Sequence, residues 1–148
     1  MAPDGDHKKY EAVIKGLDFI RKQVKPDGSI HAGRMSIYNT SICLAALVRN
    51  ADSKDRLIMS KAQQFRVDGQ TKNSLNKASD GGYGYEPAKG KNAGTDLDNT
   101  VFTLEALNLY RDMQKNEDPP AGKQLNWDAA IDLSAAASNF PPPIARAG

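Results

Sequence analysis

Asp80-Gly81-Gly82-Tyr83-Gly84-Tyr85 opens the stretch that decides the fold, and Asp96-Leu97-Asp98-Asn99-Thr100 and Leu104-Glu105-Ala106-Leu107 complete it. The last two segments have counterparts 60 positions earlier, in Tyr38-Asn39-Thr40 and Leu44-Ala45-Ala46-Leu47. Repetition at such a period is typical of proteins built from stacked structural units. The sequence therefore contains two copies of one unit.

The copies also correspond upstream of these segments. Lys15-Gly16-Leu17-Asp18-Phe19 aligns with Lys61-Ala62-Gln63-Gln64-Phe65, and the turn Asp27-Gly28-Ser29-Ile30 takes the place of the turn at 80–85. Glycines permit positive φ and a close approach of the backbone, while an aromatic residue fills the gap between successive units. Each unit is thus a helix, a glycine turn and a helix, and Ala130-Ile131-Asp132-Leu133 is interpreted as the start of a third copy.

Hydrophobic periodicity predicts a helix on each side of each turn. In the first copy the helices are expected from about 8 to 24 and from about 37 to 50, and in the second from 52 or 53 to about 66 and from 96–99 to about 114. Asp6 is expected to cap the first helix and Asp52 or Ser53 the third, and Asn50 is expected to end the second. The apolar residues that share the helix faces are Val13, Leu17, Ile20, Val24, Ile37, Leu44, Leu47, Val48, Ile58, Ala62, Phe65, Leu104, Leu107 and Leu109.

These patterns predict an all-α protein with a single helical-repeat domain over 8–138. Its units are expected at about 8–50 and 52–114, with a partial unit at 126–138 that holds a short fifth helix. A tail at 1–7 precedes the domain, and a proline-containing, disordered tail at 139–148 follows it. The glycine-rich stretch 67–95 is predicted to be a loop, and loops of this length are usually functional or mobile.

The composition excludes several classes of protein. With 39% apolar and 26% charged residues the chain is an ordinary globular sequence, and it has no apolar run long enough to cross a bilayer. The net charge of +2 is scattered along the chain, so no nucleic-acid partner is expected. The polar start lacks a secretory signal, which favours a cytoplasmic location and leaves open a leader removed earlier.

The chain has too few cysteines and histidines for an internal disulfide or a structural zinc site. A single cysteine, Cys43, rules out an internal disulfide, and with only two histidines, His7 and His31, the chain cannot supply a dedicated structural zinc site. Cys43 lies in an apolar stretch and is interpreted as a small buried hydrophobe. The glycines at 82–87 do not match the dinucleotide-binding pattern, so no cofactor and no metal are expected.

The order of the motifs resembles the repeat of protein prenyltransferases and squalene cyclases. The resemblance covers about 12–138 and is carried by the Gly-Gly-aromatic-Gly turn, the Asp-x-x-x-Thr segment and Leu-x-Ala-Leu. It implies tandem helical hairpins of an α/α toroid, here an incomplete ring, with the glycine turns and the starts of the inner helices facing a central cavity. Prenyltransferases of this kind hold zinc with Asp, Cys and His, but no zinc-ligand spacing surrounds Cys43.

Squalene cyclases also suggest candidate catalytic residues. Their acid lies in an Asp-x-Asp-Asp-Thr motif, and Asp98 of this chain matches the middle acid, with Asp96 beside it and Asn99 in place of the last acid. Such an acid protonates an alkene in a water-poor site. The alternative is that these residues cap a helix start, where acids also favour the positive end of the helix dipole. Capping accounts better for both copies, because Asn39-Thr40 recurs there without an acid pair.

Aromatic residues are the candidate substrate-binding groups. In a cyclase cavity, aromatic faces stabilise carbocations, so the resemblance assigns this role to Tyr83, Tyr85 and Phe102, with Trp127 as a further contributor. The alternative role of these side chains is packing between units.

The resemblance implies a terpene (squalene) cyclase-like repeat domain that binds or cyclises an isoprenoid chain. If the chain is an enzyme, it is then an isomerase of the squalene cyclase type. The alternative is a non-catalytic α/α repeat module, or a fragment of a longer protein, that mediates protein binding on a concave face. Because repeat arrays need polar capping units at both ends, we also expect self-association or missing downstream repeats.

Overall fold

Four α-helices and one short 3-10 helix follow one another in the computed structural model, which describes residues 10–50, 52–72, 74–75, 79–88 and 94–115. They are α1 (Glu11–Lys22), α2 (Ser36–Asn50), η2 (Ser53–Asp55), α3 (Arg56–Asp68) and α4 (Leu97–Lys115). In these ranges there is no strand, only two isolated bridges, Val24 with Ile30 and Tyr83 with Asp96. The prediction of an all-α protein is confirmed.

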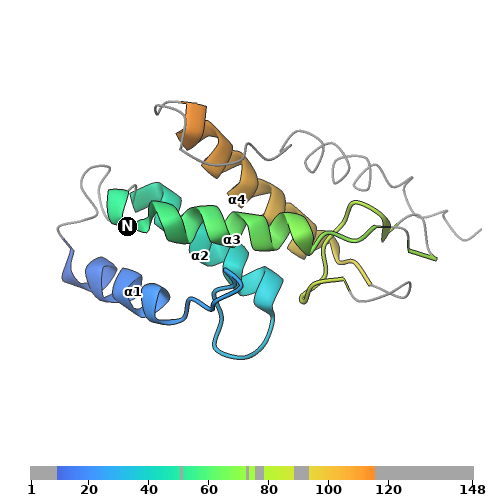
Figure 1. Cartoon of the computed structure of the whole chain (residues 1–148), viewed down its shortest axis with the longest axis horizontal. Coiled ribbons are helices and arrows are strands. Elements are labelled where there is room, and N and C mark those ends of the chain that lie inside the picture. Colours follow the sequence, from blue (N-terminus) through green and yellow to red (C-terminus); the bar gives the residue numbers. More distant parts are fainter. Residues whose placement is uncertain (1–9, 51, 73, 76–78, 89–93, 116–148) are drawn as a thin grey trace, which may run out of the picture.

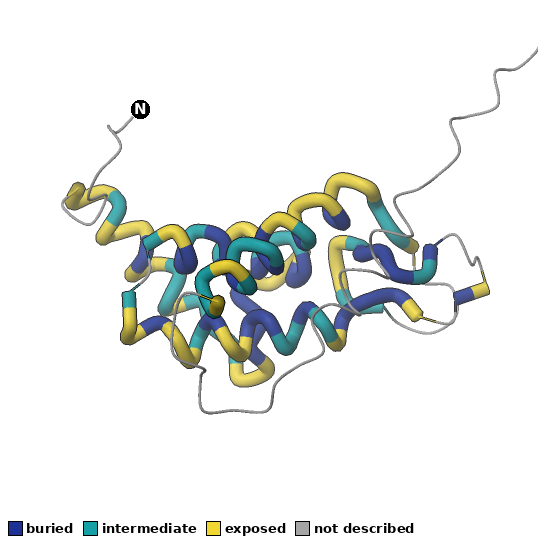
Figure 2. Tube along the Cα trace, turned by 90° about the horizontal axis from the view of Figure 1, so that it is seen from above, coloured by how far each residue is buried: buried dark blue, intermediate teal, exposed yellow. Residues whose placement is uncertain are grey.

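The helices are arranged in two layers. α3 lies across α2 in Figure 1, and α4 runs alongside α2 behind it. The most extensive contact is between α2 and α4, followed by that between α2 and α3. Buried residues line the sides on which these helices meet, as Figure 2 shows. The buried hydrophobic cluster comprises Leu17, Ile30, Leu44, Ala45, Leu47, Val48, Met59, Ala62, Ala106 and Tyr110.

The helix boundaries follow the local signals in the sequence. α2 ends at Asn50, as expected, and the Asp52 side chain accepts a hydrogen bond from the Lys54 backbone N–H at the start of η2. That interaction is the predicted cap, because it satisfies one of the free N–H groups of a helix start. α1 begins at Glu11 with Tyr10 at its N-cap position and ends at Lys22, so the expected start near 8 with Asp6 as the cap is wrong. The tails at 1–7 and 139–148, the partial unit at 126–138 and Trp127 lie outside the described residues.

The two glycine turns make the same backbone hydrogen bonds. In the first turn, Gly28 N donates to Lys25 O at 3.0 Å, and Lys25 N donates to Ser29 O at 2.8 Å. In the second, the Gly81 N–H donates to the carbonyl of Thr71 at 2.8 Å, and the Thr71 N–H donates to the carbonyl of Gly82 at 3.0 Å. Gly28 and Gly81 both have φ of 90°, a conformation that side-chain-bearing residues rarely adopt.

A threonine from the second helix fixes each turn. The Thr40 hydroxyl accepts a hydrogen bond from the Ile30 backbone N–H at 2.8 Å, and the Thr100 hydroxyl accepts one from Tyr83 N at 3.0 Å. Ile30 and Tyr83 are both completely buried. The repeated threonine is therefore needed to satisfy a buried N–H, and the residue after the glycine turn fills the core.

We expect Thr40→Val and Thr100→Val each to lower the free energy of unfolding by about 1–3 kcal/mol, because each leaves a buried N–H without its acceptor. Valine keeps the shape of threonine, so packing should change little. Chemical denaturation measures the effect, and Thr95→Val, at a half-buried threonine of the loop before α4, is the control. A loss equal to that of the control would show that these hydroxyls are not needed by the turns.

The packed side of α4 differs from the apolar face expected for it. Leu104 and Leu109 are only partly buried. The fully buried positions carry mainly polar or small residues, namely Asn99, Thr100, Thr103, Ala106, Leu107 and Tyr110. Thr100 and Thr103 are inside because their hydroxyls bond to the Tyr83 N–H and to Ser41, so hydrogen bonding rather than hydrophobicity sets the rotation of α4.

Candidate functional site

Asp96 acts as the N-cap of α4. Its Oδ1 accepts hydrogen bonds from the Asn99 backbone N–H at 2.9 Å and from Asn99 Nδ2 at 2.8 Å. The Asp96 N–H donates to the Tyr83 carbonyl at 2.9 Å, which ties the cap to the glycine turn. The carboxylate thus satisfies the third N–H of the helix, which is the usual capping geometry.

Asp98, the residue that matches the cyclase acid, is exposed in the first turn of α4. Within the described residues its side chain makes no hydrogen bond or ion pair, so the capping bond is made by Asp96 and not by Asp98. An exposed carboxylate at this place is favoured by the helix dipole alone. The arrangement does not supply the water-poor surroundings that protonation of an alkene requires.

The three candidate aromatic residues lie in two different environments. Tyr83 is completely buried in the core behind the glycine turn. Tyr85 and Phe102 are 50% and 40% exposed, and they meet on either side of Tyr38 of α2. The ring centroids of Tyr38 and Phe102 are 5.6 Å apart with an edge-to-face geometry, and those of Tyr38 and Tyr85 are 6.1 Å apart. We call Tyr38, Tyr85 and Phe102 the aromatic cluster.

The second turn holds the aromatic cluster in place by capping α2. The Ile37 N–H donates to the Tyr85 carbonyl at 3.0 Å, and the Glu86 carboxylate accepts from the backbone N–H of Ser36 at 3.2 Å and from its hydroxyl. Burial alone would raise the pKa of Glu86, but the hydrogen bonds from Ser36 outweigh it and lower that pKa. Two free N–H groups at the start of α2 are therefore satisfied by the Tyr85 carbonyl and the Glu86 carboxylate of the second glycine turn.

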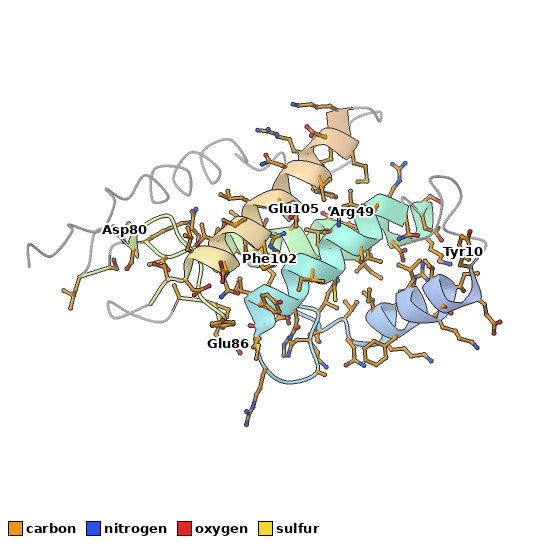
Figure 3. The ribbon with its side chains drawn as sticks, turned by 180° about the vertical axis from the view of Figure 1, so that it is seen from behind. Tyr10, Arg49, Asp80, Glu86, Phe102 and Glu105 are labelled. Carbon is orange, nitrogen blue, oxygen red and sulfur yellow. The ribbon has the colours of Figure 1, made fainter. Side chains whose placement is uncertain are left out.

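The aromatic cluster lies on the face of α2 and α4 that points away from α3. Figure 3 views this face, with Phe102 over α2 and the labelled residues Arg49 and Glu105 facing each other from α2 and α4, which run side by side. Arg49 Nη2 and Glu105 Oε1 are 2.6 Å apart and both side chains are exposed. We call this the open face; it has an aromatic centre and a charged pair farther along the helices.

Sequence patterns did not mark Tyr38 as a candidate, because its aligned position in the second copy is not aromatic. It occupies the position that Asp98 occupies in the second copy, and Ile42 occupies that of Phe102. Residues four apart on a helix share a side. Asp98 therefore projects from the same side of α4 as Phe102, and the acid and the aromatic cluster belong to one face.

A buried arginine is the other feature that sequence patterns did not reveal. Arg66 of α3 is completely buried, and its Nη2 donates to the carbonyl of Thr103. Its Nε and Nη1 have no hydrogen-bond partner, and among the described residues no carboxylate forms an ion pair with it. Burial lowers the pKa of Arg66 to about 10, an effect that the nearby Tyr83 opposes. In the first copy, the aligned position is Ile20, which gave no hint of a charge.

The structure offers little for metal or thiol chemistry. In the described ranges, no group of three or more His, Cys, Asp and Glu residues could hold a metal ion. Cys43 is partly buried on α2, and this burial raises the pKa of its thiol to about 11, which keeps it protonated at neutral pH. None of the helices that are described is both long and apolar enough to span a membrane.

No protein-family model matches the chain, and no curated protein or solved structure matches it either.

Proposed function

We propose that the chain is a terpene-cyclase-like repeat domain, an incomplete α/α toroid, that binds an isoprenoid chain on the open face of α2 and α4. The observation that carries the proposal is the aromatic cluster, in which two partly exposed rings flank Tyr38 on one surface. Aromatic side chains offer large, rigid apolar area, and their negative faces favour unsaturated or cationic carbon. Exposed Ile42 of α2 extends the apolar surface along the helix.

Binding rather than cyclisation is the activity proposed for the chain. Of the two acids that match the cyclase motif, Asp98 lies on the open face and is exposed, and Asp96 is occupied in capping α4 through the Asn99 N–H. A proton donor for an alkene needs a pocket from which water is excluded. Cyclisation would therefore require further protein to cover this face.

The proposal is tested with farnesol, a short polyprenyl alcohol, by isothermal titration calorimetry. We expect saturable binding that Phe102→Ala and Tyr85→Ala each weaken about tenfold, which corresponds to about 1.4 kcal/mol for one aromatic contact. Both residues are partly exposed, so the variants should fold normally. Phe19→Ala is the matched control, because Phe19 is an exposed aromatic residue of α1 outside the cluster.

Asp98→Asn separates binding from catalysis in the same system. We expect farnesol affinity to be unchanged and the parent chain to form no cyclised product from squalene. Equal farnesol affinity in the parent, Phe102→Ala and Tyr85→Ala would contradict the proposed site. Product from the parent that disappears in Asp98→Asn, with unchanged melting, would instead establish Asp98 as a cyclase acid.

A protein-binding module is the second candidate. The exposed pair of Arg49 of α2 and Glu105 of α4 favours it, because protein interfaces commonly place a polar rim beside an aromatic centre. Failure of the parent chain to bind farnesol would favour this candidate over the first.

A further inference from the structure

The contact between α2 and α4 uses two different sides of one repeated helix. α2 contributes the side that carries Ser41, and α4 contributes the side that carries Thr103; their hydroxyl oxygens are 3.1 Å apart. Both sides are buried along their length. The residues on the first side are Ile37, Ser41, Leu44 and Val48, and those on the second are Asn99, Thr103, Ala106 and Tyr110.

The 60-residue correspondence places each of these two sides a second time, one on α4 and the other on α2. The side that α2 buries recurs on α4, where its first half is exposed: Leu97 is 63% exposed and Val101 is 51% exposed, while Leu104 and Asn108 are half-buried. We call it the free side of α4; it consists of Leu97, Val101, Leu104 and Asn108.

The side of α4 that contacts α2 also has a counterpart, which lies on α2 itself. We call it the receiving side of α2; it consists of Asn39, Cys43, Ala46 and Asn50, all of which are half-buried, and Cys43 also touches the chain's own hydrophobic core. Three of its residues match their counterparts closely, because Asn39 aligns with Asn99, Cys43 with Thr103 and Ala46 with Ala106. Each of the two sides that form the α2–α4 contact therefore has a counterpart elsewhere in the chain.

We propose that the free side of α4 in one chain binds the receiving side of α2 in a second copy of the chain. The contact continues the α2–α4 interface from one molecule into the next. Because it joins two different surfaces, it is a head-to-tail contact, which builds a closed ring or an open filament rather than a two-fold dimer. Val101 then lies against Cys43 of the next copy, as Ser41 lies against Thr103 within the chain.

The chemistry of the two sides fits this partner. Neither side contains a charged residue, so their contact buries no unpaired charge. Exposed Leu97 and Val101 gain burial, and the small side chains of Cys43 and Ala46 leave room for them. The α2–α4 contact within the chain combines the same kinds of residue. There, Ile37 and Leu44 lie on the side of α2 that faces Thr103 and Ala106 of α4.

The test is a cysteine introduced on the free side of α4, because Cys43 is the natural thiol on the receiving side. Val101→Cys is treated with the diazene oxidant diamide, which accepts the two electrons and two protons released when two thiols form a disulfide. We expect a ladder of disulfide-linked oligomers on non-reducing electrophoresis, since each chain presents one thiol to each neighbour. The variant should fold, because residue 101 is exposed.

Two control variants define the contact. Val101→Cys combined with Cys43→Ala removes the partner thiol and should give no ladder. Leu57→Cys places a thiol at an exposed position of α3 outside both sides, and should link at least tenfold more slowly than Val101→Cys. Equal rates for Leu57→Cys and Val101→Cys would overturn the proposal, as would equally fast linkage of the wild-type chain through Cys43 alone, which requires a symmetric contact.

Light scattering provides a second measurement that needs no cysteine. The wild-type mass should rise above the 16.1 kDa of one chain as concentration increases. Val101→Glu should remain monomeric with an unchanged melting temperature, because its carboxylate is tolerated in water but not in an apolar contact. A wild-type mass of 16.1 kDa at every concentration would overturn the proposal.

Discussion

Replacement of Arg21 by alanine should destabilise the protein by about 3 kcal/mol or more. The guanidinium of Arg21 makes two parallel hydrogen bonds of 2.8 Å to the carboxylate of Asp55, whose side chain is almost completely buried. These bonds raise the pKa of Arg21 above its usual value. Removal of the arginine would leave the buried carboxylate without its partner, which costs far more than loss of a surface ion pair.

Thermal unfolding measures this effect, with an expected fall in the melting temperature of roughly 10 °C or more. Arg21→Lys should recover only part of the loss, since one ammonium group cannot make two parallel bonds. Arg21→Met combined with Asp55→Leu should be more stable than Arg21→Ala, because it leaves no unpaired charge. A small loss in Arg21→Ala would mean that water or the start of α3 compensates Asp55.

The sequence predicts the elements well because their signals are local. The end of α2 at Asn50, the cap at Asp52 and the turn at Gly28 each depend on residues within a few positions of one another. The repeat also places Thr40 and Thr100 in the same role in the two turns. These features follow from the conformational preferences of short segments.

The candidate site is less predictable because it depends on contacts between distant segments. Tyr85 and Phe102 have the same aromatic character as Tyr83, but only the path of the second turn decides that Tyr83 is in the core. Tyr38 joins the aromatic cluster through rings 47 and 64 positions away in the sequence, at Tyr85 and Phe102. No local pattern marks such a meeting point.

The burial of the charged residue Arg66 could not be predicted from the sequence either. Its aligned position in the first copy is Ile20, and an arginine at a helical position normally extends to solvent. Its burial follows from how α3 lies on α4, where its guanidinium reaches the Thr103 carbonyl. Only the assembled layers show that a cation has been placed in the core.

Arg66→Met should therefore stabilise the protein by about 1–4 kcal/mol, because methionine fills similar space without a desolvated charge. The Nη2 bond to the Thr103 carbonyl does not compensate for the unpaired Nε and Nη1. Chemical denaturation at pH 8 measures the gain. Arg49→Met is the matched control, because Arg49 is exposed and pairs with Glu105 at the surface, and its effect should stay within about 1 kcal/mol.

The pH dependence tests whether charge causes the gain. Burial lowers the pKa of Arg66 from its usual value to about 10, so below pH 10 the group is protonated in both the folded and the unfolded state and the full cost of the buried charge is present. Above pH 10 the folded state releases its proton first, and the wild type regains stability relative to Arg66→Met. The difference in unfolding free energy between the two should narrow from pH 8 to pH 10.5. A constant difference would assign the gain to packing, and a loss in Arg66→Met at pH 8 would show that an anionic partner compensates this guanidinium.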